Sequence, residues 1–104
     1  MLVQVNFGDV EHSDALETRV RDEVRDALKH HEDQITRIEA HLRDDNSSHK
    51  HGADDKRCTL EARVAGRDPV TVEEASDDLY KSIHLCAKKL GRLIDHTFEK
   101  LADR

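Results

Sequence analysis

The chain has little of what several classes of protein depend on. Its 104 residues include no tryptophan, one tyrosine, two phenylalanines and one proline. No apolar run approaches the roughly 18 residues that a transmembrane helix needs, and the N-terminus lacks the basic and long apolar segments of a secretion signal. Only two cysteines occur, Cys58 and Cys86. We therefore expect one cytoplasmic domain spanning residues 1–104, with both cysteines as reduced thiols.

Charge is abundant and unevenly distributed. Charged residues make up 38% of the chain and hydrophobic residues 36%, which predicts a thin core under a densely charged surface. The formal net charge is −6, but residues 81–104 contain six Lys or Arg against three Asp or Glu. This segment therefore carries +3, and residues 1–80 carry −9. The electrostatic potential at the binding surface, and not the total charge, decides whether a polyanion can bind. The negative net charge therefore does not exclude nucleic acid as a partner.

The hydrophobic periodicity predicts a single α+β domain with the element order β-α-β-β-β-α. Strands are expected at residues 2–7, 35–42, 58–64 and 70–72, and helices from Ser13 to about residues 29–31 and from Ser76–Asp78 onward. The polar segment 43–57 is predicted to be an exposed, mobile loop. Two amphipathic helices hide their apolar stripes most economically on the same face of a four-stranded mixed sheet, which leaves the other face to solvent.

The final helix has the clearest amphipathic pattern. Its expected core positions are Leu79, Ile83, Cys86, Ala87, Leu90, Leu93, Ile94, Thr97 and Leu101. Opposite them, at about 100° per residue, lies a basic stripe that consists of Lys81, Lys88, Lys89, Arg92, His96 and Lys100. Such a stripe can meet several phosphates of a nucleic acid, with Arg92 suited to bidentate contacts. An ordinary solvated helix face is the alternative.

A second basic group lies on the first helix. Arg21, Arg25 and Lys29 follow one another at intervals of four, so they share one side of the helix. Three acidic residues lie among them. Taken alone, this pattern is typical of ion pairs within a helix, each worth a few tenths of a kcal/mol. We therefore expect this group to assist the final helix rather than to form a site of its own.

Eight histidines raise the question of a metal site. They are densest at His30–His31 and at His49 and His51, but no spacing matches a structural zinc motif. The sequence also lacks the motifs of a catalytic nucleophile, a phosphate loop or a metalloprotease. We therefore expect a protein without cofactor, metal or enzymatic activity. Protonation of His84 and His96 would extend the basic stripe as the pH falls.

Two motifs give the chain a family resemblance over nearly its whole length. They are Val10–Leu16 (VEHSDAL) at the first helix, and Asp78-Leu79-Tyr80 with Ile83, Lys89-Leu90, Arg92 and Ile94 in the second. Together with the element order, these motifs resemble the ribosome hibernation-promoting factor and ribosome-associated inhibitor family. The resemblance implies a double-stranded-RNA-binding-like fold and a non-enzymatic protein.

The resemblance also implies a partner and a site. Family members bind the small ribosomal subunit and its ribosomal RNA near the decoding centre. There they overlap the messenger and transfer RNA sites and idle the ribosome. The family's basic helix residues match here at Lys89, Arg92 and Lys100, and His96 stands where a lysine is common.

The chain also departs from the family pattern. Glu23 and Asp26 fall near positions that are often lysine in relatives, so the first helix has fewer cations. The polar loop is longer than in short relatives, and the chain stops at Arg104 without the further domain that long members use to pair ribosomes. The acidic first helix leaves a second hypothesis open, a protein-interaction or regulatory module on the same fold that binds RNA weakly or not at all.

Overall fold

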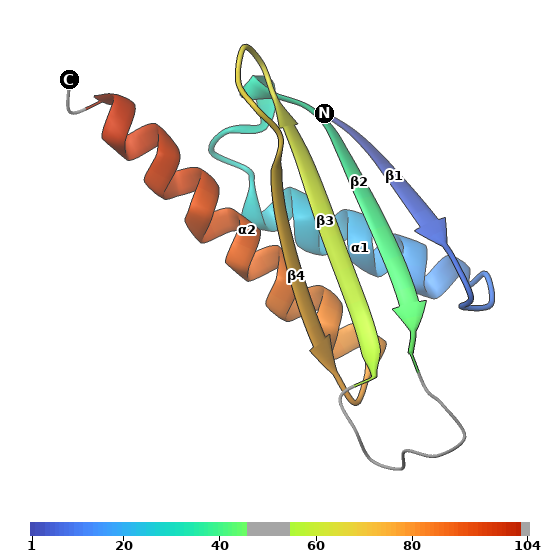
Figure 1. The fold of residues 1–104 in the computed structure, drawn as a ribbon. Helices are drawn as coiled ribbons and strands as arrows, with labels where there is room; N and C mark the ends of the chain where they lie inside the picture. Colours follow the sequence, from blue (N-terminus) through green and yellow to red (C-terminus); the bar gives the residue numbers. More distant parts are fainter. Residues whose placement is uncertain (46–54, 103–104) are drawn as a thin grey trace.

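The computed structural model describes residues 1–45 and 55–102, with side chains up to Glu99. Its elements are β1 (Leu2–Phe7), α1 (Asp14–Ala27), η1 (Glu32–Gln34), β2 (Ile35–Asp44), β3 (Lys56–Val64), β4 (Val70–Ser76) and α2 (Leu79–Ala102). The order matches the prediction, with one short 3₁₀ turn added (Figure 1). The predicted loop 43–57 is shortened at both ends because β2 and β3 continue into it, and its centre lies outside the described residues. No helix in the described ranges is long and apolar enough to span a membrane.

The strands form one mixed sheet in the order β1-β2-β3-β4. β1 runs parallel to β2, with Leu2 opposite Arg37, and the other two pairs are antiparallel. Both helices pack on the same face of this sheet (Figure 1). Their apolar stripes and the inward side chains of the strands form one core, which confirms the predicted α+β architecture.

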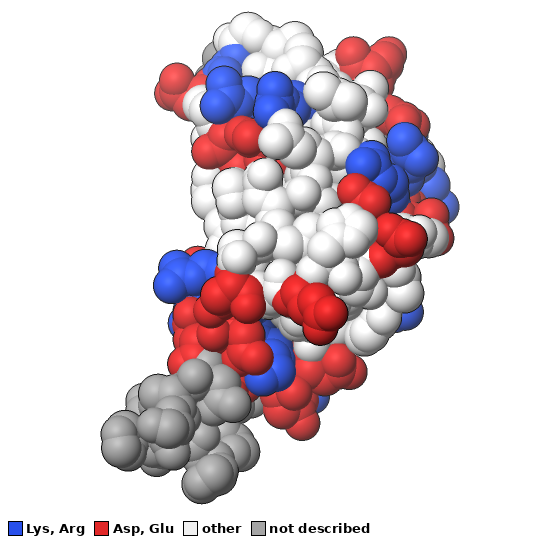
Figure 2. Space-filling view, turned by 90° about the vertical axis from the view of Figure 1, so that its right-hand side faces the viewer, with Lys and Arg blue, Asp and Glu red and all other residues white. Residues whose placement is uncertain are grey.

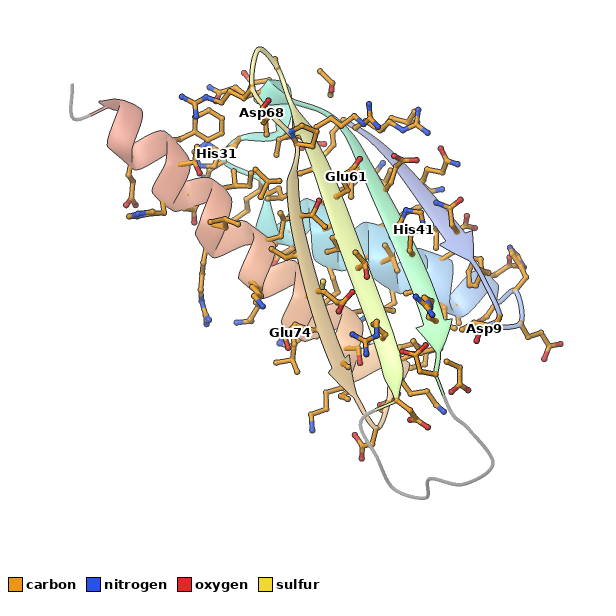
Figure 3. All side chains as sticks on the ribbon, viewed as in Figure 1. Asp9, His31, His41, Glu61, Asp68 and Glu74 are labelled. Carbon is orange, nitrogen blue, oxygen red and sulfur yellow. The ribbon has the colours of Figure 1, made fainter. Side chains whose placement is uncertain are left out.

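The other face of the sheet is open and carries a set of ion pairs, here called the open-face network. It consists of Arg37, Glu39, Arg57, Glu61, Arg63 and Glu73. Towards the β1 edge, positive and negative side chains likewise alternate in small clusters (Figure 2). Glu61 projects from the open face near the middle of β3 (Figure 3). Because exposed pairs of opposite sign cancel one another's field, this face offers little attraction to a polyanion.

Ser13 begins α1 as predicted. Its Oγ accepts a hydrogen bond from the Leu16 N–H at 3.2 Å, and acidic residues occupy the first turn, where the helix dipole favours them. The helix ends at Ala27, before the predicted residues 29–31, because Leu28 leaves helical geometry as the C-cap. Leu28 is buried there and joins the core.

The start of α2 confirms the predicted cap at Asp78 but not at Ser76. Ser76 belongs to β4 rather than to the helix cap, and Asp78 Oδ1 accepts a hydrogen bond from the Tyr80 N–H at 3.1 Å. The Ser76 hydroxyl is buried and lies 2.6 Å from the Ser82 hydroxyl, which donates to the Lys56 carbonyl oxygen. Serine is a common cap residue, so the sequence pattern alone favours it. Here the two hydroxyls instead fix the first turn of α2 against β3 and β4.

Leu93 is not in the core, contrary to the prediction from helical spacing. It is 41% exposed, whereas Ile94 is fully buried. α2 crosses the sheet diagonally and its C-terminal part extends past the β4 edge (Figure 1), so the sheet covers this part of the helix less completely. Leu93 and Val72 instead line a shallow, mainly apolar groove between α2 and β4. The side chain of Leu101, also predicted to be in the core, lies outside the described part.

Gly91 sets the distance between the two helices. A Cβ built on Gly91 would lie 2.9 Å from the Ala27 carbonyl oxygen and 3.3 Å from the Ala27 Cβ. The first distance is shorter than any ordinary van der Waals contact, so only glycine lets α2 approach α1 this closely. The two helices therefore form one tightly packed layer over the sheet.

The two cysteines are free thiols buried next to each other between β3 and α2. The Cys86 Sγ–H donates to the Cys58 carbonyl oxygen at 3.3 Å. The hydrogen bond with Cys86, together with burial, raises the pKa of the Cys58 thiol far above its usual value. Both observations predict two unreactive thiols in the folded protein.

We expect neither thiol to react with a disulfide reagent at about pH 8 under native conditions, because the thiolate is the reactive form. In denaturant both should react, and a titration with Ellman's reagent counts them. Rapid reaction of the native protein would show that this part of the core opens readily.

Candidate nucleic-acid interface

The predicted basic stripe lies along the solvent side of α2. Lys88 and Arg92 each fall within about 20° of Lys81 around the helix axis, and all three are exposed. Among the residues that the structure describes, Lys88 and Arg92 form no ion pair. They lie one turn apart on the same side, and together they define the Lys88–Arg92 face. Two unpaired cations at this spacing can contact neighbouring phosphates.

The other predicted cations of α2 flank this face. Lys81 lies 4.0 Å from Asp77, and Lys89 lies 3.4 Å from Glu74 on β4. Exposed pairs of this kind are weak, so both lysines can exchange their carboxylates for a phosphate. His96 is exposed and lines the apolar groove beside β4. The Lys100 side chain lies outside the described residues.

On its other flank, the Lys88–Arg92 face borders a groove between α1 and α2, called here the interhelical groove. Its volume is about 220 Å³, and it is lined by Glu23, Asp26, Ala27, His84, Ala87, Lys88, Gly91, Arg92 and Asp95. The wall formed by α1 is acidic, because Glu23 contacts His84 of α2 and Asp26 also lines the groove. The groove therefore sets carboxylates directly beside the free cations.

The basic group of α1 does not join the face on α2. The Arg21 guanidinium donates to the Val3 carbonyl oxygen at 2.7 Å and lies 3.4 Å from Glu17, so it points towards β1. Lys29 lies 3.8 Å from Asp26, and Arg25 is exposed. The acidic wall of the interhelical groove separates these residues from Lys88 and Arg92. The structure thus places the two predicted basic groups apart.

Two histidines bridge the helices through contacts that the sequence did not reveal. His84 Nδ1 lies 2.9 Å from Glu23 Oε2, and His31 Nε2 lies 2.9 Å from Asp95 Oδ1. Burial raises the pKa of Glu23, but the hydrogen bonds from His84 and Arg19 outweigh burial and lower it overall. The partners are 61 and 64 residues apart, so no local pattern could have indicated them.

His31 is held in place from two sides. Its ring stacks on Phe98 of α2 with a centroid distance of 4.7 Å and an interplanar angle of 22°. It lies between the turn after α1 and the C-terminal half of α2 (Figure 3). The aromatic contact and the Asp95 hydrogen bond together anchor this turn to α2. His31 is therefore a structural bridge rather than a member of a histidine pair with His30.

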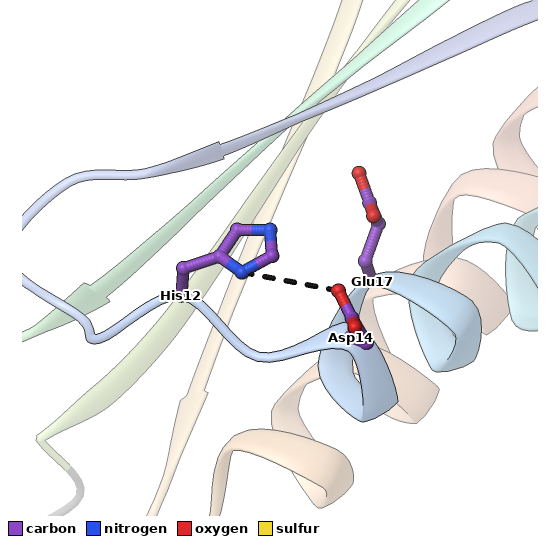
Figure 4. Close-up of side chains that lie close together, drawn as sticks. All are labelled: His12, Asp14 and Glu17. Carbon is purple, nitrogen blue, oxygen red and sulfur yellow. Dashed lines mark ion pairs between the residues drawn. The ribbon is translucent and has the colours of Figure 1, made fainter.

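A different cluster has the composition of a metal site. His12, Asp14 and Glu17 at the start of α1 have ligand atoms within 4.8 Å of one another (Figure 4). His12 and Asp14 are exposed, and Glu17 already pairs with Arg21 at 3.4 Å. The positive end of the helix dipole also disfavours a cation there. We therefore assign no metal to this exposed cluster. His49 and His51, where histidines are also dense in the sequence, lie outside the described residues.

Comparison with known proteins identifies the family. The fold is that of a small α+β domain with two helices on one face of a mixed sheet. The model of the family described as "Sigma 54 modulation protein / S30EA ribosomal protein" matches residues 3–102. The chain therefore belongs to this family of non-enzymatic, ribosome-associated hibernation and translation-inhibition factors.

Two solved structures share the fold. One is a ribosomal subunit interface protein from Coxiella burnetii, with a TM-score of 0.78, 20% identity, and coverage of 95% of this chain and 99% of that chain. The other is the N-terminal domain of Protein Y from Thermus thermophilus, with a TM-score of 0.73, 18% identity, and coverage of 93% and 99%. No curated protein matches the chain.

Proposed function

We propose that the protein binds the small ribosomal subunit near the decoding centre and blocks the messenger and transfer RNA sites by occupying them. The observation that carries this proposal is the Lys88–Arg92 face, free of ion pairs among the described residues, in a chain of this family. The resemblance supplies the location on the ribosome, and the structure supplies a surface with the matching charge.

The chemistry of the proposed contact is charge neutralisation. The Arg92 guanidinium can donate two parallel hydrogen bonds to one phosphate, and Lys88 acts as a point charge one turn away. Lys81 and Lys89 add two more cations once they release Asp77 and Glu74. Inhibition then needs no reacting group, because a bound domain excludes other ligands from the space that it fills.

A second function is favoured by one observation, the acidic wall of the interhelical groove. Glu23 and Asp26 repel phosphate and would suit a basic protein partner instead. A pull-down with Lys88→Glu plus Arg92→Glu separates the two functions. A non-ribosomal partner that the variant still retains would favour the protein-interaction module, whereas loss of ribosomal subunits from the variant's pull-down favours the ribosomal function.

Salt dependence gives a quantitative test of the ribosomal function. If Lys81, Lys88, Lys89 and Arg92 each neutralise one phosphate, log affinity should fall with log salt at a slope of about −3 to −4. Sedimentation with purified small subunits between about 50 and 200 mM salt measures this slope. No co-sedimentation at the lowest salt, or a slope near zero, would overturn the proposed function.

A further inference from the structure

The charged groups around the interhelical groove are nearly balanced in number. Lys88 and Arg92 line the groove together with three carboxylates, those of Glu23, Asp26 and Asp95. With neutral histidines, the lining is one charge negative overall. Arg19 and Lys29 pair with Glu23 and Asp26 without lining the groove. Within the groove itself, a phosphate that approaches the Lys88–Arg92 face meets cations and carboxylates in similar number.

Two of these three carboxylates have a histidine as direct partner. His84 lies 2.9 Å from Glu23, and His31 lies 2.9 Å from Asp95. Imidazole changes its charge between about pH 5 and 8. As the pH falls, each histidine gains one positive charge beside its carboxylate. The groove and its two histidine partners then change from one charge negative to one charge positive.

We propose that protonation of His84 and His31 controls the binding of RNA phosphates at the Lys88–Arg92 face, which makes ribosome association tighter as the pH falls. This inference rests on the proposed function and adds its regulation. The histidines act by neutralising the carboxylates that face the bound phosphates, so they need not touch the RNA. His84 contacts α1 and His31 contacts α2, so the charge change is local to the site.

The surroundings of both histidines agree with this role. His84 contacts Glu23 of α1 and lines the groove together with Asp26 and Lys88, while Arg19 shares the Glu23 carboxylate. His31 faces Asp95 and the Phe98 ring of α2. Each histidine is thus in direct contact with one carboxylate that lines the groove.

The experiment compares binding to small ribosomal subunits at about pH 7.5 and about pH 6.0 at constant ionic strength. We expect the wild type to bind about tenfold more tightly at the lower pH. The His31→Gln plus His84→Gln variant keeps hydrogen-bonding groups but cannot gain charge at these two positions. Only the exposed His96 beside the face can then still respond, so the change should fall to about threefold or less. His30→Gln plus His41→Gln, which alters two exposed histidines off the groove, should keep the wild-type pH dependence.

A second variant tests the role of the carboxylates that the two histidines contact. Glu23→Gln plus Asp95→Asn removes the two carboxylates permanently, so it should bind at about pH 7.5 as tightly as the wild type does at about pH 6.0. Circular dichroism melting checks that each variant is folded. The inference is overturned if the wild type binds subunits but the histidine variant keeps the full pH dependence. It is also overturned if the carboxylate variant gains no affinity at about pH 7.5. A wild type that binds subunits at neither pH overturns the proposed function as well, and the two failures are thereby distinguished.

Discussion

Replacing Gly91 by leucine should lower the melting temperature of the protein by roughly 15 °C. A Cβ at this position already comes within 2.9 Å of the Ala27 carbonyl oxygen, and the rest of the leucine side chain would have to fit between α1 and α2. Overpacking of this severity costs about 3 kcal/mol. A loss of 1 kcal/mol shifts the midpoint of a domain of about 100 residues by roughly 5 °C. Calorimetry on the purified variant measures the shift.

Ala15→Leu provides the matched control for Gly91→Leu. Ala15 is exposed on α1, so the larger side chain should change the free energy of unfolding by no more than about 0.5 kcal/mol. Gly91→Ala should lie between the two, because a gain in helix propensity of about 1 kcal/mol offsets part of the clash. If Gly91→Leu melts like the wild type, the helices do not approach as closely as the structure shows.

Reversing the charges of Lys88 and Arg92 together should weaken binding to small ribosomal subunits by about 100-fold at moderate salt. Two phosphate contacts are lost, and two carboxylates then add repulsion beside the acidic wall of the interhelical groove. The slope of log affinity against log salt should become shallower by about 2, or one unit for each lost contact. Sedimentation or fluorescence anisotropy across a salt series measures both quantities.

The control for this reversal carries the same change in net charge at a different place. Arg63→Glu plus Arg67→Glu alters the open face and the exposed β3–β4 turn, and it should weaken binding less than about threefold, through long-range potential alone. Equal losses in both double variants would mean that total charge, and not the Lys88–Arg92 face, governs association.

Most of the fold was predictable because it depends on local patterns. Alternating residues identified the strands, and Ser13 marked the start of α1 correctly. The errors occurred where tertiary packing decides the outcome. Ser76 has the chemistry of a cap but forms part of β4. Leu93 has the spacing of a core residue but lies beside Val72 at the edge of the contact between α2 and the sheet, where it is exposed. Neither the diagonal path of α2 nor the length of β4 can be predicted from a short stretch of the sequence.

The candidate site was predictable only in part, for a similar reason. Helical geometry alone put Lys88 and Arg92 on one exposed side of α2. It could not show that Arg21 is held by the Val3 carbonyl oxygen on the far side of α1. The pairing of His84 with Glu23 was hidden too, because it joins residues 61 positions apart. The charges along one helix can be predicted from the sequence. Which charged residues of a neighbouring helix face them depends on how the two helices pack.

The open-face network has a consequence for how the molecule would meet a large, highly charged partner. Its arginines and glutamates are already matched, so a phosphate-rich surface exerts almost no pull on that half of the protein. Among the described residues, the unpaired Lys88 and Arg92 lie on the helical side, so the two sides of the sheet differ in charge and form a local electric dipole. The field of such a surface would rotate the dipole before contact. Productive encounters would then begin with α2 facing the surface and the sheet facing away from it.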